Sequence, residues 1–107
     1  MCDMIIHVKT EIIRIENDEG EGPYFNPKID FGRTFKHCSS IKYPEPCDDI
    51  GIKRYPYERE KCGFKNTMQL LQWFTRNELR EMKKHGFKIK RVKGFVTANG
   101  KNQILFV

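Results

Sequence analysis

β-Branched and apolar residues at the start of the chain predict a β-strand. The segment from Met4 to Glu16, MIIHVKTEIIRIE, is followed by polar turn residues, and its β-branched side chains favour extended backbone. The apolar positions change parity along this segment: Ile6, Val8 and Ile12 share one face of an ideal strand, and Ile13 and Ile15 share the other. We expect a β-bulge near Thr10–Glu11 to bring them onto one face.

Two capping patterns in the second half of the chain predict two short helices. Asn66 followed three residues later by Gln69 predicts a helix from Thr67 to Phe74, in which Trp73 belongs to the core. Thr75 followed by Glu78 predicts a second helix, from Arg76 to about His85. Gly86 then stands where a left-handed residue ends the helix, and Phe87 where the accompanying hydrophobic contact belongs.

The C-terminal residues predict strands. The segments Phe87–Val92 and Phe95–Thr97 have strand-like composition, and Asn99-Gly100 predicts a hairpin with a type I′ turn. Gln103–Val107 is apolar at positions of both parities. We therefore expect this last strand to be central or covered on both faces.

The stretch from Tyr24 to Gly63 shows no regular period. Together with Pro23 it holds all five prolines of the chain, and it offers only Ile29–Phe31 and Ser40–Tyr43 as short strand candidates. Its many aromatic residues indicate that it packs against the core. The chain is thus predicted to be a single α+β domain, 1–107. Its N-terminal strand pairs with a C-terminal β-hairpin, two short helices lie on one side, and residues 24–63 are irregular.

The positive charge of the chain is concentrated near its C-terminal end. The 107 residues have a formal net charge of +6, of which residues 76–107 contribute +7 and residues 1–75 contribute −1. Such a block attracts phosphates or acidic protein surfaces, although a basic face is also an ordinary solvated face. The candidate partner-binding residues are Arg76, Arg80, Lys83, Lys84, Lys88, Lys90, Arg91 and Lys93.

The cysteines and acidic residues give no strong sign of a metal site. Cys2, Cys38, Cys47 and Cys62 lack the close CxxC spacing of structural zinc sites, and adjacent His37 and Cys38 point to opposite faces of a strand. The start of the chain does not resemble a secretory signal, and no apolar run is long enough for a membrane span. We therefore expect a cytoplasmic protein with reduced thiols that act as small hydrophobes, no metal and no membrane contact. The loop acids Asp18-Glu19 and Asp48-Asp49 are expected to be solvated.

The two ends of the chain resemble those of small uncharacterised phage proteins. The similarity lies in Ile13-Arg14-Ile15-Glu16, Gly22-Pro23-Tyr24, the run from Cys62 to Phe74, His85-Gly86-Phe87 and Gln103-Ile104-Leu105-Phe106. The layout is similar to a minimal ADP-ribosyltransferase-like fold. Some proteins with this fold serve phages as inhibitors of host defence, which includes anti-CRISPR inhibition. If the resemblance extends to chemistry, Arg14, Tyr24 and Gln103 would lie near a cleft that holds NAD. In that family the corresponding residue is a charged catalytic glutamate, whereas Gln103 carries a neutral amide. The resemblance therefore supports catalysis less than it supports the fold.

Three functions remain open on the sequence. The preferred one is a non-enzymatic phage protein that docks on a host protein with an acidic surface, or on a protein–nucleic-acid complex, in the host cytoplasm, and uses no cofactor. The second is an ADP-ribosyltransferase-like enzyme that uses NAD. The third is a nucleic-acid-binding module that uses the basic C-terminal face.

Overall fold

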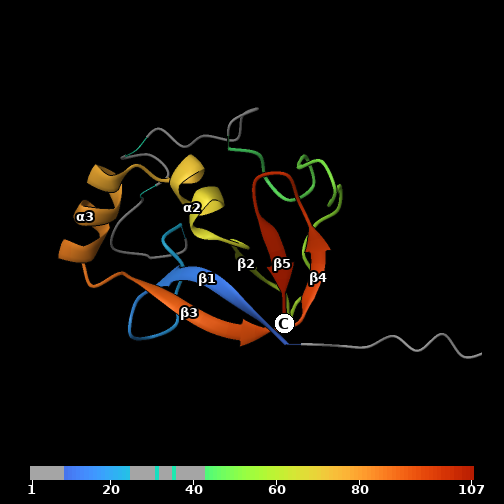
Figure 1. The fold of residues 1–107 in the computed structure, drawn as a ribbon, viewed down its shortest axis with the longest axis horizontal. Helices are drawn as coiled ribbons and strands as arrows, with labels where there is room; N and C mark the ends of the chain where they lie inside the picture. The colour runs from blue at the N-terminus through green and yellow to red at the C-terminus, as the bar shows by residue number, and fades with distance from the viewer. Residues whose placement is uncertain (1–8, 25–30, 32–34, 36–42) are drawn as a thin grey trace, which may run out of the picture.

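The computed structural model describes residues 9–24, 31, 35 and 43–107 (Figure 1). Their strands are β1 (Thr10–Glu16), β2 (Lys61–Gly63), β3 (Lys88–Gly94), β4 (Val96–Asn99) and β5 (Ile104–Phe106); the helices are α2 (Thr67–Trp73) and α3 (Arg76–Lys84). β1 pairs with β3 in an antiparallel ribbon, and β2, β5 and β4 form a second sheet in that order. The prediction of an α+β domain, in which the N-terminal strand pairs with the C-terminal strand region, is confirmed.

β1 contains no bulge, because it buries apolar side chains on both faces. Its register with β3 runs without interruption from Thr10 opposite Gly94 to Glu16 opposite Lys88. Ile12 packs with the second sheet, whereas Ile13 and Ile15 pack in the aromatic core beside the helices. The bulge prediction at Thr10–Glu11 was therefore wrong: the change of parity marks two cores, not one.

The predicted helix boundaries and caps are largely confirmed. Thr75 and Glu78 form the reciprocal capping box of α3. Gly86 adopts φ +87°, and the N–H groups of Gly86 and Phe87 donate to the carbonyls of Lys83 and Met82, which is a Schellman motif. α2 differs in one respect. Asn66 accepts from the Gln69 N–H, but the Gln69 side chain accepts from Lys65 N–H rather than from the N-cap residue.

The C-terminal hairpin differs from the predicted type I′ turn. Asn99 pairs with Ile104, so four residues connect β4 to β5, and neither Asn99 nor Gly100 has a positive φ. Gly100 is needed for a close approach instead, because a Cβ there would lie 2.5 Å from Oδ2 of Asp49 and from the Gln103 carbonyl oxygen. The expectation for the last strand is confirmed: β5 is the central strand of its sheet, and all three of its residues are buried.

The middle of the chain contributes both structure and exposed surface. β2, which the sequence did not predict, pairs with β5, and the backbones of Phe64 and Ile13 exchange two hydrogen bonds that join β2 to β1. The strand candidates Ile29–Phe31 and Ser40–Tyr43 fall mostly outside the described residues. Phe31 accepts from Phe35 N–H in a helical i to i+4 pattern.

The two helices cover the aromatic core on one side of the β1–β3 ribbon (Figure 1). Trp73 is 8% exposed, which confirms its predicted place in the core. Tyr24, Phe35 and Tyr43 pack against this core, as expected for the middle region. Neither described helix has the length and apolar character that crossing a membrane requires.

Candidate functional site

A cleft of about 720 Å³ lies between β1, β2, the end of α2 and the loops of the middle region. Its walls are mostly aromatic rings and prolines: Pro23, Tyr24, Tyr43, Pro44, Pro46, Tyr55, Pro56, Phe64, Trp73 and Phe74. Arg14, Tyr24 and Gln103 all line this cleft. The structure thus brings together three residues that stand far apart in the sequence.

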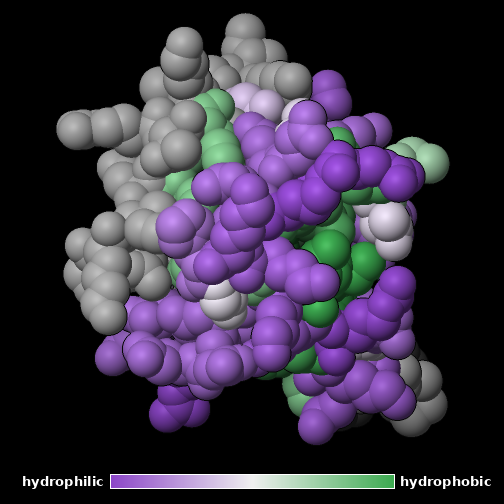
Figure 2. All heavy atoms as spheres, turned by 90° about the vertical axis from the view of Figure 1, so that its left-hand side faces the viewer, coloured by the Kyte–Doolittle hydropathy of each residue, from purple (hydrophilic) through white to green (hydrophobic). Residues whose placement is uncertain are grey.

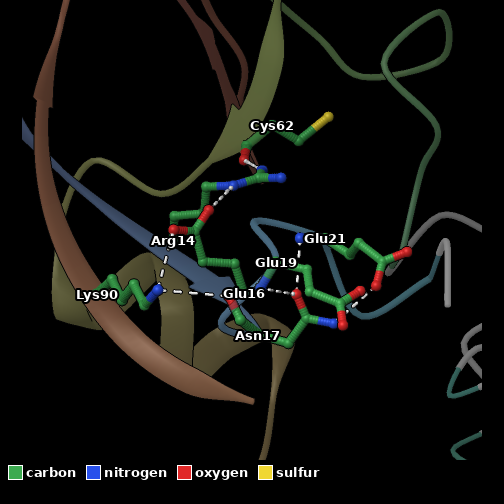
Figure 3. A network of polar contacts seen from close by, with 7 residues as sticks. All are labelled: Arg14, Glu16, Asn17, Glu19, Glu21, Cys62 and Lys90. Atoms are coloured by element: carbon green, nitrogen blue, oxygen red, sulfur yellow. Dashed lines mark hydrogen bonds and ion pairs between the residues drawn. The ribbon is translucent and has the colours of Figure 1, made fainter. Parts of the chain in front are cut away.

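Arg14 joins β1 to β2 at the edge of the cleft (Figure 3). Its Nε lies 3.0 Å from Oε2 of Glu16, and its Nη1 donates to the Cys62 carbonyl at 2.6 Å. Lys90, on β3, approaches the other Glu16 oxygen at 3.4 Å. Burial disfavours the charged form of Glu16, but hydrogen bonds from Arg14 and Lys90 outweigh it and lower the pKa of the carboxyl.

One nitrogen of Arg14 is left over by this network. Among the described residues, Nη2 has no hydrogen-bond acceptor, and a Cβ on Gly22 would lie 3.5 Å from it. Gly22 also lines the cleft. A side chain at Gly22 would therefore contact this guanidinium nitrogen at the wall of the cleft.

Tyr24 and Gln103 already have protein partners. The Tyr24 hydroxyl accepts from Nε1 of Trp73 at 2.6 Å, and burial raises the pKa of this phenol. Gln103 is 5% exposed and donates from its amide to the Pro44 carbonyl at 2.8 Å. Both side chains therefore hold the walls of the cleft together.

The thiols and loop acids match the sequence expectations only in part. Cys47 and Cys62 are free, whereas Cys2, His37 and Cys38 lie outside the described residues. Cys62 is exposed as a residue, but partial desolvation of its thiol raises the pKa of that group. Asp49 was expected to be solvated, but it is fully buried, and its carboxylate accepts from the backbone and side-chain N–H groups of Asn102.

Most of the cations of β3 have acidic partners. Lys88 pairs with Asp18 at 3.7 Å, Lys90 with Glu16 at 3.4 Å and Arg91 with Glu11 at 2.7 Å. All three carboxylates come from β1 or the residues just after it. The +7 block in the sequence is therefore partly neutralised by the N-terminal strand, and Lys93 is the β3 cation that has no described carboxylate partner.

The cations of α3 differ from those of β3. Arg76, Arg80 and Lys83 are exposed, and none of them has a carboxylate partner among the described residues. Arg80 donates to the neutral Asn77 side chain, and Lys84 pairs with Glu81 of the same helix. Figure 2, which faces the α3 side of the molecule, shows a largely hydrophilic surface with an apolar area between polar side chains.

Beside the cleft lies an aromatic platform, which the sequence did not predict. We use this name for Arg54, Tyr55, Tyr57 and Glu60. The Glu60 side chain is 3% exposed and accepts from both terminal nitrogens of Arg54, from Tyr57 N–H and from the Thr97 hydroxyl. These hydrogen bonds, those from Arg54 foremost, lower the pKa of Glu60 to about 2. The Arg54 guanidinium lies 4.2 Å from the centre of the Tyr57 ring, so the ring is held in place while 68% of Tyr57 stays exposed.

The fold and these surfaces define a small α+β domain with an aromatic cleft and one helix face whose cations have no carboxylate partner among the residues that the structure describes. The model of the family described as Bacteriophage T4 Y00F protein matches residues 4–107, and the chain belongs to this family. Searches of curated proteins and of solved structures give no match. The expected likeness to small phage proteins is confirmed, whereas the likeness to ADP-ribosyltransferases stays a prediction.

Proposed function

We propose that this phage protein is a non-enzymatic docking protein that binds an acidic surface of a host protein through α3 and modulates that protein. The observation that carries the proposal is the difference between the two groups of cations. Three of the four β3 cations pair with carboxylates within the fold, whereas Arg76, Arg80 and Lys83 have no acidic partner in the described structure and remain available to one outside it.

The arrangement of α3 supports a directional surface rather than scattered charge. Residues 76, 80 and 83 follow the i, i+4, i+7 spacing of one helix face. The helix is fixed at both ends by its capping box and its Schellman motif, so these side chains project from a defined backbone. A fixed positive face steers an acidic partner by long-range attraction, which acts mainly on the association rate.

Paired charge-reversal variants test this proposal. One variant carries Arg76→Glu, Arg80→Glu and Lys83→Glu. The matched control carries Arg59→Glu, Lys65→Glu and Lys101→Glu, which are also exposed. Each reversal lowers the formal net charge by two units, so three reversals bring both variants from +6 to zero. Wild type and both variants are immobilised and exposed to lysate of a bacterial host, with and without nuclease treatment. The retained proteins are identified by mass spectrometry.

We expect a host protein that wild type and control retain and the α3 variant loses. With that purified protein, the association rate of wild type should fall as salt is added, because the Debye length shrinks to about 8 Å at physiological ionic strength. Equal retention by all three proteins would contradict the proposal. Binding that nuclease removes, with a steep linear loss of log affinity against log salt, would assign α3 to nucleic acid instead.

A second candidate is an NAD-using function of the cleft. Its support is that Arg14, Tyr24 and Gln103 line the same cavity. Gln103 carries a neutral amide, however, so it has no charge with which to stabilise an oxocarbenium-like transition state. Its amide N–H also already donates a hydrogen bond to the Pro44 carbonyl. Measuring the melting temperature with and without NAD tests binding, since a ligand at 100 times its Kd stabilises by about 2.7 kcal/mol.

A further inference from the structure

We propose that the cleft binds a short, extended, acidic peptide segment of a partner protein. This site is separate from the cationic face of α3. It therefore goes beyond the docking function proposed above, and it can hold whether or not α3 binds a partner.

The walls of the cleft favour a peptide that carries proline or aliphatic side chains. Tyrosine, tryptophan and proline side chains supply most of the lining, and aromatic-lined grooves are the usual docking surface for extended polyproline-type segments. A helix is about 10–12 Å across with its side chains. A cavity of about 720 Å³ therefore encloses little more than one turn of helix, whereas it accommodates several side chains of an extended segment.

The charges that line the cleft favour a carboxylate on that segment. Glu60 lines the cleft, but Arg54 neutralises it. Glu16 lies outside the lining and pairs with both Arg14 and Lys90. Two positive groups of the lining are left for a ligand: Nη2 of Arg14, and the exposed Lys61, which has no ion pair among the described residues. The exposed lining carboxylate that opposes them is Glu45. Nη2 lies in a side chain that is only 13% exposed, where a hydrogen bond to a carboxylate is stronger than at the surface.

The aromatic platform extends this site beyond the cavity. Tyr55 lines the cleft and is 71% exposed, and Tyr57 lies two residues further on. Tyrosine and arginine are the residues most often found at energetic centres of protein interfaces. Because Glu60 already fixes Arg54 and the Tyr57 backbone, a peptide that crosses the platform would immobilise few additional side chains, which reduces the entropic cost of binding.

The experiment is a selection of random dodecapeptides displayed on phage against the immobilised full-length chain. We expect the selected peptides to share a glutamate or aspartate close to proline or aliphatic residues. Synthetic labelled copies are then titrated against purified variants by fluorescence anisotropy, and the folding of each variant is checked by thermal melting.

Two pairs of variants locate the binding site. Gly22→Leu places a side chain beside Nη2 of Arg14, and Glu19→Leu introduces a leucine in the same loop at a position that does not line the cleft. Lys61→Glu reverses an exposed charge at the cleft, and Lys65→Glu reverses an exposed charge outside it. We expect Gly22→Leu to weaken peptide binding at least tenfold and Lys61→Glu about fivefold, while both controls keep wild-type affinity.

The triple α3 variant separates this inference from the proposed function. Selected peptides should bind that variant as they bind wild type, even where docking on the host protein is lost. The cleft proposal is wrong if the selection enriches no peptide, if enriched peptides lack carboxylates, or if folded Gly22→Leu binds them unchanged. Displacement of the selected peptides by NAD would assign the cleft to a nucleotide.

Discussion

The cations of β3 and those of α3 are alike in the sequence and different in the fold. Both groups belong to the same basic block of residues 76–107. β3 lies antiparallel to β1, and Lys88, Lys90 and Arg91 each pair with a carboxylate of β1 or of the turn after it. No strand among the described residues supplies carboxylates to α3 in this way. The comparison teaches that cations close together in the sequence can differ in whether the fold supplies them with a counter-charge, and only those without one are candidates for binding a partner.

Reversing a β3 cation should produce the largest loss of stability. Lys90→Glu removes the contact with Glu16 and the bond to the Asn17 carbonyl, and it places a carboxylate beside a half-buried one. We expect the free energy of unfolding to fall by about 2 kcal/mol, measured by urea denaturation. Arg80→Glu on α3 is the matched reversal and should change it by less than about 0.5 kcal/mol. Equal losses of stability in the two variants would mean that the β3 and α3 cations do not differ in their contribution to the fold.

The ionisation of Glu16 should make the β1–β3 ribbon sensitive to acid. Because the folded-state pKa of Glu16 lies below its ordinary value of 4.5, its stabilising effect is complete above about pH 4.5. This effect is lost as the pH falls through the lowered pKa. We expect Glu16→Gln to be less stable than wild type at pH 7, by about 1 kcal/mol, with the difference shrinking as the solution is acidified. A difference that stays constant down to pH 3 would show that the charge of Glu16 is unimportant.

The exposed pair on the same ribbon should contribute less. Arg91 and Glu11 lie 2.7 Å apart, but both side chains are more than half exposed. A double-mutant cycle with Arg91→Ala and Glu11→Ala should give a coupling free energy of about 0.2–1 kcal/mol that weakens as salt is added. A coupling free energy as large as the stability loss of Lys90→Glu would mean that the burial of an ion pair does not determine how strongly it stabilises the fold.

Removing the α3 cations should have the smallest effect on the fold. Replacing Arg76, Arg80 and Lys83 together by Gln should leave the free energy of unfolding within about 0.5 kcal/mol of wild type, because none of these residues has a carboxylate partner in the described structure. Association with the host protein should nevertheless slow down. A loss of stability comparable to that of Lys90→Glu would mean that these three cations have a structural role within the fold.

Local signals made much of the fold predictable. The capping box at Thr75, the left-handed Gly86 and the covered C-terminal strand all depend on residues within one turn or one strand. β2 was missed because Lys61-Cys62-Gly63 has no strand pattern of its own; pairing with β5 makes it a strand. The Asn99-Gly100 pair has the composition of a type I′ turn, but the connection is four residues long, and Gly100 instead permits the close approach of the distant Asp49.

The candidate site was predictable only in fragments. A resemblance placed Arg14, Tyr24 and Gln103 near one cleft, but the aromatic walls of this cleft come from segments up to 50 residues apart in the sequence. The pairing of Arg91 with Glu11 spans 80 positions, and no charge count along the chain shows it. Glu60 could have been suspected from the arginine six residues before it, although only the structure shows that its side chain is buried.

The division of β1 between two cores determines where this family can gain or lose residues. Because Ile12 serves one core and Ile13 and Ile15 the other, a one-residue insertion or deletion between them would exchange the two faces of the strand beyond that point. The turn from Asn17 to Glu21 closes on itself through the Asn17 side chain and backbone (Figure 3), so length changes after it leave the strand register intact. Natural length variants should therefore accumulate after this turn and be absent from Ile12–Ile15.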